Sequence, residues 1–105
     1  MNIANTFKSG TLKIYDALKK EYPKAVVMIC VADVMRICDD DLEVFKKHFG
    51  YMNIEVTTFK GRKIGKCANG WMDTYIRTVL NLEKLEAVVY DAEKHTLTVS
   101  RKVEI

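Results

Sequence analysis

Proline, glycine and long apolar runs are all scarce in this chain, which has one proline and five glycines among 105 residues. Flexible linkers and disordered tails are poor in apolar residues, whereas 49% of this chain is hydrophobic. A chain of this length is typical of a single domain around one core. We therefore expect residues 1–105 to form one folded domain.

The longest apolar run, Ala25 to Ala32, has only eight residues and is followed at once by Asp33. A membrane-spanning helix needs about 20 apolar residues, so we expect no membrane partner. The chain begins MNIANTFKSG, which lacks the cationic start and the apolar stretch of a secretory signal. These features together predict a cytoplasmic location.

The three cysteines, Cys30, Cys38 and Cys67, are odd in number and show no C-x-x-C spacing. Cys30 and Cys38 have apolar neighbours, where buried free thiols are common, so we expect no disulfide framework. His48 and His95 are far apart, and neither has a cysteine or carboxylate at a zinc-like spacing. We therefore expect no metal site.

Two segments have the three- or four-residue apolar spacing of an amphipathic helix. The first covers residues 11–20, with Ser9 or Thr11 as its N-cap and Pro23 beyond its end. The second starts at Asn69 and Gly70 and repeats large apolar residues on one face. That set comprises Trp71, Tyr75, Val79 and Leu82, together with Met72 and Ile76.

A third helix is predicted after Asp39, Asp40 and Asp41, because carboxylates are favourable at the electropositive N-terminus of a helix. Asp40 and Glu43 resemble a capping box. The helix is expected to continue to about residue 48, with Gly50 ending it in the left-handed conformation.

Alternating residues predict strands in two other parts of the chain. In residues 54–58, the side chains alternate in type with a period of two. The chain then turns through residues 60–62 and is extended again from Ile64, which indicates a β-hairpin. Residues 85–90 and 96–103 predict a second hairpin. Residues 25–38 fit either a buried strand or a buried helix, and the β-branched first half favours the strand.

These elements predict an α+β fold. The two hairpins would form an antiparallel sheet of about four strands, with about three helices packed on one face. No internal repeat or linker divides the chain.

The net charge is only +3, but the basic residues are unevenly distributed. Between residues 59 and 82, five basic residues face one acidic residue, Asp73, a local balance of +4. The stretch 61–71, GRKIGKCANGW, leads into a predicted helix N-terminus, which attracts anions. The candidate residues for binding an anion or nucleic acid are Lys60, Arg62, Lys63, Lys66, Trp71 and Arg77. The alternative is a solvated turn whose lysines protect an edge strand.

The sequence lacks residues that more specific functions, such as nucleotide binding or nucleophilic catalysis, require. Gly61 and Gly65 are one residue too close for a phosphate-binding loop, and Cys67 replaces the hydroxyl that would bind magnesium. Cys67 beside Lys66 has no base partner for nucleophilic catalysis. Aromatic residues near the turn could stack on bases, but their spacing is more typical of a core. We expect no catalytic residues and no cofactor.

The order hairpin, helix, hairpin between Phe45 and Arg101 is similar to ligand-binding domains of the vinyl-reductase-like and heme nitric oxide-binding group. The segments that carry the resemblance are Phe49-Gly50, Ile54-Glu55-Val56, Gly70-Trp71 and Val88-Val89-Tyr90. The resemblance implies a small-ligand sensor. The cysteines near the C-terminus that are typical of this group are absent, and no histidine can be assigned as a heme ligand.

Our leading interpretation is a non-catalytic intracellular interaction or adaptor domain that binds another protein, because no acid, base, nucleophile or metal ligands converge in the sequence. The alternatives are nucleic-acid or phosphate binding through the basic hairpin at residues 60–66, and small-ligand sensing. A short exposed edge strand would also permit a homodimer.

Overall fold

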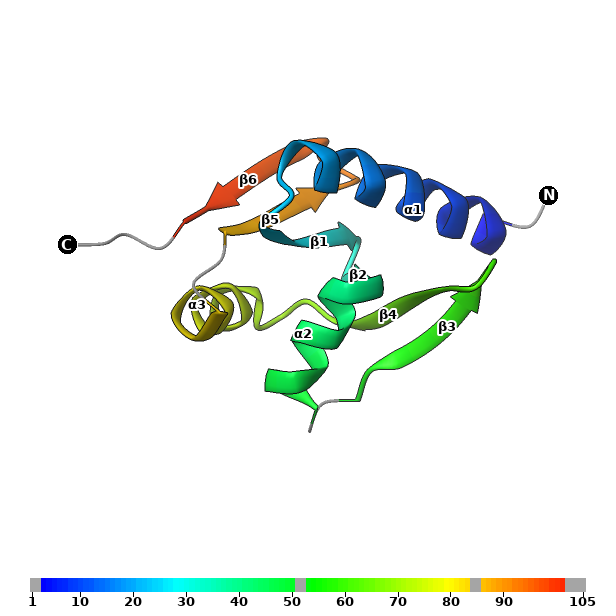
Figure 1. Cartoon of the computed structure of the whole chain (residues 1–105). Coiled ribbons are helices and arrows are strands. Elements are labelled where there is room, and N and C mark those ends of the chain that lie inside the picture. The colour runs from blue at the N-terminus through cyan, green and yellow to red at the C-terminus, as the bar shows by residue number, and fades with distance from the viewer. Residues whose placement is uncertain (1–2, 51–52, 84–85, 102–105) are drawn as a thin grey trace.

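The structure, a computed structural model, describes residues 3–50, 53–83 and 86–101. Along this part of the chain, each helix is followed by a pair of strands (Figure 1). The elements are α1 (Ile3–Glu21), β1 (Ala25–Val31), β2 (Val34–Cys38), α2 (Asp39–Phe49), β3 (Glu55–Phe59), β4 (Arg62–Ala68), α3 (Met72–Glu83), β5 (Glu86–Asp91) and β6 (Thr96–Ser100). The predicted α+β class is confirmed. No helix in these residues is both long enough and apolar enough to cross a membrane.

The described strands form one mixed sheet of six strands in the order β3-β4-β2-β1-β5-β6. The two predicted hairpins are present as β3-β4 and β5-β6, and the predicted strand positions 85, 102 and 103 lie outside the described residues. The expected count of about four antiparallel strands is corrected to six, because residues 25–38 form a third hairpin between the other two. The sheet is mixed because β1 and β5 run parallel.

The preference for a strand over a helix in residues 25–38 is confirmed, with a turn at Ala32 and Asp33 that divides the segment into β1 and β2. Ala32 has a φ of 55°, in the left-handed region. All of β1 except Val31 is buried, because β1 lies in the middle of the sheet and has helices over both faces. A strand buried on both faces has no polar alternation, which explains why its sequence also fitted a buried helix.

The helices cover both faces of the sheet, and the expectation that they pack on one face is wrong. Figure 1 shows α1 on one side of the sheet and α2 with α3 on the other. On the α1 side, Leu12, Tyr15 and Leu18 form a core with Val27 and Ile29. The apolar residues of β1 point alternately to the two faces, so each face needs a helix to exclude water.

On the other side of the sheet, aromatic rings join α2 to α3. The Phe45 and Phe49 ring centroids are 4.7 Å apart, and Tyr75 of α3 lies 5.2 Å and 5.0 Å from them in edge-on arrangements. Such edge-to-face contacts are favourable for aromatic pairs. Met28 and Met35 complete this core from the sheet. The aromatic contacts fix the position of α3 relative to α2.

The predicted helix ends are corrected in three places. The first helix begins at Ile3, before the proposed caps Ser9 and Thr11. At the start of α2, Cys38 is the N-cap and makes no side-chain capping bond. Gly50 has a φ of −61°, so the second helix does not end in the left-handed conformation.

Two of the three aspartates at the start of α2 bind other parts of the protein. Asp41 is buried, and its Oδ2 accepts a hydrogen bond from the Val27 backbone N–H at 3.0 Å. Its Oδ1 accepts one from Lys19 Nζ at 3.2 Å. Asp39 accepts hydrogen bonds from Arg62 of β4. These carboxylates therefore connect α2 to β1, α1 and β4.

Candidate functional site

The six predicted site residues do not converge. Lys60, Arg62 and Lys63 lie at the β3-β4 turn, and Lys66 lies further along β4. Of the last two residues, Trp71 immediately precedes α3 and Arg77 lies within it. Since the seven residues of β4 span roughly 23 Å, the turn and α3 are at opposite ends of that strand.

The turn at Lys60 and Gly61 has the conformation that a two-residue hairpin needs. Their φ angles are 51° and 78°, both left-handed, as in a type I′ turn. The exposed Lys60 places its Nζ 5.5 Å from the centroid of the Phe59 ring, within range of a cation–π interaction. The predicted turn is therefore confirmed.

Arg62 is bound by two carboxylates of the protein itself. Its Nη1 and Nη2 donate to the two oxygens of Asp16 at 2.8 and 2.7 Å. Its Nε and Nη2 donate to Asp39 Oδ2 at 2.9 and 2.6 Å. The hydrogen bonds from Arg62 lower the pKa of Asp16, and the two carboxylates raise the pKa of Arg62. Arg62 therefore links α1, α2 and β4.

The surface around Arg62 carries both signs of charge. A hollow of about 470 Å³ lies between the hairpin turn and the first turn of α2. Its lining residues are Asp39, Asp40, Glu43, Gly61, Arg62 and Lys63. The Lys63 backbone N–H also donates to Asp39 Oδ1 at 3.2 Å. The positive balance counted along the sequence is thus offset in space by the acidic end of α2.

Lys66 lies on the α1 side of the sheet, away from Lys63. In register, it is opposite Glu55 of β3 and Arg36 of β2. Arg36 Nη1 in turn donates to Thr11 Oγ1 of α1 at 3.0 Å. Lys66 is half-buried, and its positive charge is next to one acidic and one basic side chain.

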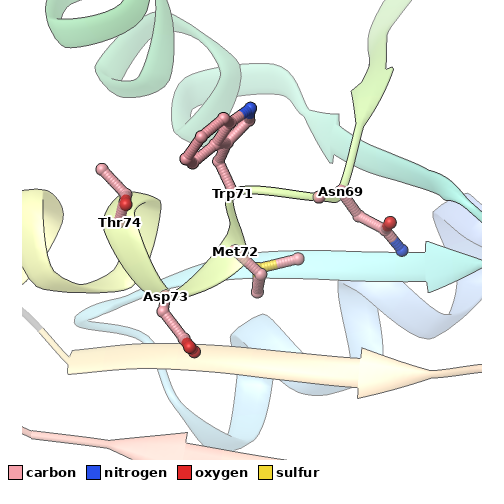
Figure 2. Close-up of a pocket in the computed structure, with 6 residues that line it drawn as sticks. Asn69, Trp71, Met72, Asp73 and Thr74 are labelled. Carbon is pink, nitrogen blue, oxygen red and sulfur yellow. The ribbon is translucent and has the colours of Figure 1, made fainter.

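Trp71 is exposed at the start of α3. Its side chain is 69% exposed and borders a hollow of about 290 Å³ lined by residues 69–74. Figure 2 shows the indole projecting from the loop toward α2, while the Asp73 side chain points to the opposite side. Asp73 lies in the first turn of α3, where its negative charge offsets the anion-attracting N-terminus.

The loop before Trp71 is fixed to the turn between β1 and β2. The Asn69 backbone N–H donates to the Asp33 carbonyl at 3.2 Å, and Asn69 Nδ2 donates to the Ala32 carbonyl at 3.0 Å. The Tyr75 N–H donates to the Trp71 carbonyl at 3.0 Å, which starts the helical turn. These bonds hold the Trp71 backbone in a defined position.

Arg77 lies on a different flank of α3 from Trp71. At 100° per residue, positions 71 and 77 are separated by about 120° around the helix axis. Arg77 lines a groove of about 380 Å³ between α3 and β6. The groove residues are Asp73, Ile76, Arg77, Leu80, Thr98 and Ser100. The structure therefore separates Arg77 from Trp71 and brings Arg77 to the edge strand β6.

Sequence reasoning placed Leu82 with the buried residues of α3, but it is 61% exposed. Tyr75 and Val79 are buried, as their spacing predicted. Together with Met72 and Ile76, they centre the buried face about 80° away from Trp71 and Leu82 around the helix axis. The apolar residues of α3 extend over a wider arc of the helix surface than its buried face covers. This excess width was the sequence signal that some of these residues are exposed.

The three cysteines are free and buried, as predicted for Cys30 and Cys38. Burial raises the pKa of the Cys67 thiol to about 11, so at neutral pH it is protonated and weakly nucleophilic. Within residues 3–50, 53–83 and 86–101, no three His, Cys, Asp or Glu side chains form a group that could hold a metal ion. No family model matches the chain, and no curated protein shows significant sequence similarity to it.

Proposed function

We propose that this chain is a non-catalytic interaction domain that binds another protein through one exposed flank of α3. We call this surface the tryptophan flank and define it by Trp71, Thr78 and Leu82. At 100° per residue, the three positions fall within about 40° of one another around the helix axis. Trp71 and Leu82 are 69% and 61% exposed, and Thr78 between them is half-buried.

The exposure of Trp71 is the observation that carries the proposal. Among the side chains that the structure describes, every other aromatic residue is buried or half-buried. Leaving an indole in water forgoes the hydrophobic stabilisation that its burial would give. Tryptophan is enriched in the centres of protein interfaces, where its truncation often costs more than other contacts. A protein partner would cover this apolar surface.

The hydrogen bonds of Asn69 add a second argument. They fix the backbone that carries Trp71, so binding does not have to order a mobile loop. A preorganised anchor loses less conformational entropy on association than a flexible one. The tryptophan flank therefore combines an exposed aromatic anchor with a rigid support.

The alternative of nucleic-acid or phosphate binding has less support. Arg62 is engaged by Asp16 and Asp39, and three acidic residues line the hollow beside Lys63. A phosphate backbone needs a continuous basic surface, and its binding weakens steeply with salt. For the small-ligand alternative, the hollow at Trp71 is lined by the single segment 69–74. We therefore keep protein binding as the proposal.

The test begins with a photo-crosslinking amino acid introduced at position 82 in the intact chain, expressed in its native cells. The same amino acid at position 20, exposed on α1 and outside the tryptophan flank, is the matched control. A partner captured at 82 and not at 20 is then purified, and its Kd is measured for the wild type and for Trp71→Ala. The proposal expects Trp71→Ala to weaken binding by about 30-fold, as for an interface hot spot.

Two results would contradict the proposal: equal crosslinking at positions 82 and 20, or an unchanged Kd for Trp71→Ala. Stability is the internal control, since an exposed side chain contributes little and Trp71→Ala should change the unfolding free energy by only about 0.5 kcal/mol. Trp71 is the one tryptophan of the chain, so its fluorescence also reports directly whether a partner covers it.

A further inference from the structure

The strand β6 forms one edge of the described sheet and lacks the charged residues and proline that protect many edge strands. Among the described strands it pairs only with β5, so its outer backbone N–H and C=O groups are available to another strand. Its sequence, Thr96 to Ser100, is TLTVS, with no charge, proline or glycine. The opposite edge strand, β3, contains the charged Glu55. An uncharged edge with high β-propensity is a template for strand addition.

The two faces of β6 differ. Thr98 and Ser100 point to the α3 side, where they line the groove with α3. Leu97 and Val99 point to the α1 side, opposite Tyr90 and Val88 of β5. Leu97 is 42% exposed. A strand added to β6 would cover this apolar side chain.

The flank of α3 that faces β6 carries one charge of each sign. Asp73 and Arg77 are exposed, lie one helical turn apart and line the same groove as Thr98. A two-fold axis perpendicular to a helix or strand places the two copies of that element antiparallel to each other. The acidic residue of one copy then faces the basic residue of the other, in two identical contacts. The surface is therefore complementary in charge to itself.

We propose that β6 pairs antiparallel with β6 of a second copy of this chain, with Thr98 on the two-fold axis. The two sheets then become continuous, and Leu97 lies opposite Val99 of the second copy. The axis is perpendicular to the sheet, so both α3 helices lie on the same face. Asp73 of each copy then approaches Arg77 of the other. The tryptophan flank is on another side of α3 and stays exposed, so this dimer and the proposed function can be tested separately.

Analytical ultracentrifugation over a concentration series tests the proposal first on the full chain. The wild type should show a monomer–dimer equilibrium. Thr98→Lys places a charge on the two-fold axis and should shift the protein to monomer. Thr58→Lys is the matched control, because Thr58 is also an exposed threonine on an edge strand, β3. It should dimerise like the wild type.

Exchanging the charges at positions 73 and 77 tests whether Asp73 of one copy lies next to Arg77 of the other. Asp73→Arg and Arg77→Asp each bring like charges together and should raise the dimer Kd about tenfold. The double variant restores opposite charges and should return the Kd close to the wild-type value. A variant that merely misfolds would not be rescued in this way.

Three outcomes would overturn the proposal. The wild type could remain monomeric at every concentration. In that case, the strand that pairs with β6 would have to come from an extended segment of a different protein. Thr58→Lys could dissociate the dimer while Thr98→Lys does not, which would place the interface on β3. The double charge variant could dimerise no better than the single ones, which would exclude the antiparallel arrangement of the α3 helices.

Discussion

The buried carboxylate of Asp41 should be one of the most sensitive single positions for stability. The side chain is 6% exposed and accepts hydrogen bonds from the Val27 N–H and from Lys19 Nζ. The Tyr15 side chain also interacts with this carboxylate, so Asp41→Ala leaves three donors without this acceptor. Removing one partner of a buried ion pair costs 3–5 kcal/mol, and the Lys19 side chain, at 26% exposure, regains some hydration. We therefore expect a loss of about 3 kcal/mol.

Urea unfolding followed by circular dichroism at neutral pH measures this loss. Asp40→Ala is the matched control, because Asp40 is the exposed neighbour in the same helical turn, and it should cost about 0.5 kcal/mol or less. Asp41→Asn keeps an acceptor for the Val27 N–H and should fall between the two. Equal losses for Asp41→Ala and Asp40→Ala would refute the assigned role.

The pH dependence gives an independent check. Burial raises the pKa of Asp41 above its usual 3.8, although the hydrogen bond from Val27 and the charge of Lys19 lower it in part. The folded state thus binds this proton more tightly than the unfolded state. The stability that comes from this tighter proton binding is therefore fully present below pH 3.8 and is lost as the pH rises through the folded pKa. The loss expected for Asp41→Ala at neutral pH comes from the hydrogen bonds that the carboxylate still accepts. The wild type should lose stability relative to Asp41→Asn over this range, and parallel curves would contradict the argument.

Two further predictions concern the Arg62 contacts and the glycines. Arg62→Gln should lower stability by about 1 kcal/mol, a small value because these ion pairs are partly solvated. Arg62 lowers the pKa of Asp16, so this contribution should disappear as the pH falls through that pKa; a difference from wild type that persists in acid, measured by thermal unfolding, would refute it. Gly65→Ala should cost about 2 kcal/mol in urea unfolding, because its new methyl group would overlap Leu42 in the core. Gly10→Ala is the matched control: the site is open and lies within α1, so the change should stabilise the helix by about 0.5 kcal/mol, and equal effects at both glycines would contradict the packing argument.

The hairpins β3-β4 and β5-β6 could be predicted from the sequence because their signals are local. Alternation over a few residues and the turn at Lys60 and Gly61 specify such a pair without reference to the rest of the chain. The helical periodicity after Asn69 is local in the same sense. The strand β1 is different, because its apolar run shows neither the alternation of a half-buried strand nor a helical period. Whether it is a strand or a helix is decided only by its neighbours in the sheet and by the helices on both faces.

The candidate site depended much more on tertiary structure. Five basic residues close in sequence predicted one basic surface, yet the fold places Arg62 between Asp16 and Asp39 and Arg77 beside β6. The partners of Arg62 come from α1 and α2, and the groove beside Arg77 is completed by β6, all of them distant in the sequence. Local composition therefore could not show whether each charge was paired.

Composition and periodicity by themselves determined the α+β class, the two hairpins and the amphipathic helices, because these follow from short-range sterics and from the pattern of apolar residues. Only the tertiary structure decided the parallel pairing of β1 with β5, the helices on both faces and the exposure of Trp71. Each of these depends on which distant segments compete for the same apolar surface. That competition is resolved only when the whole chain packs together.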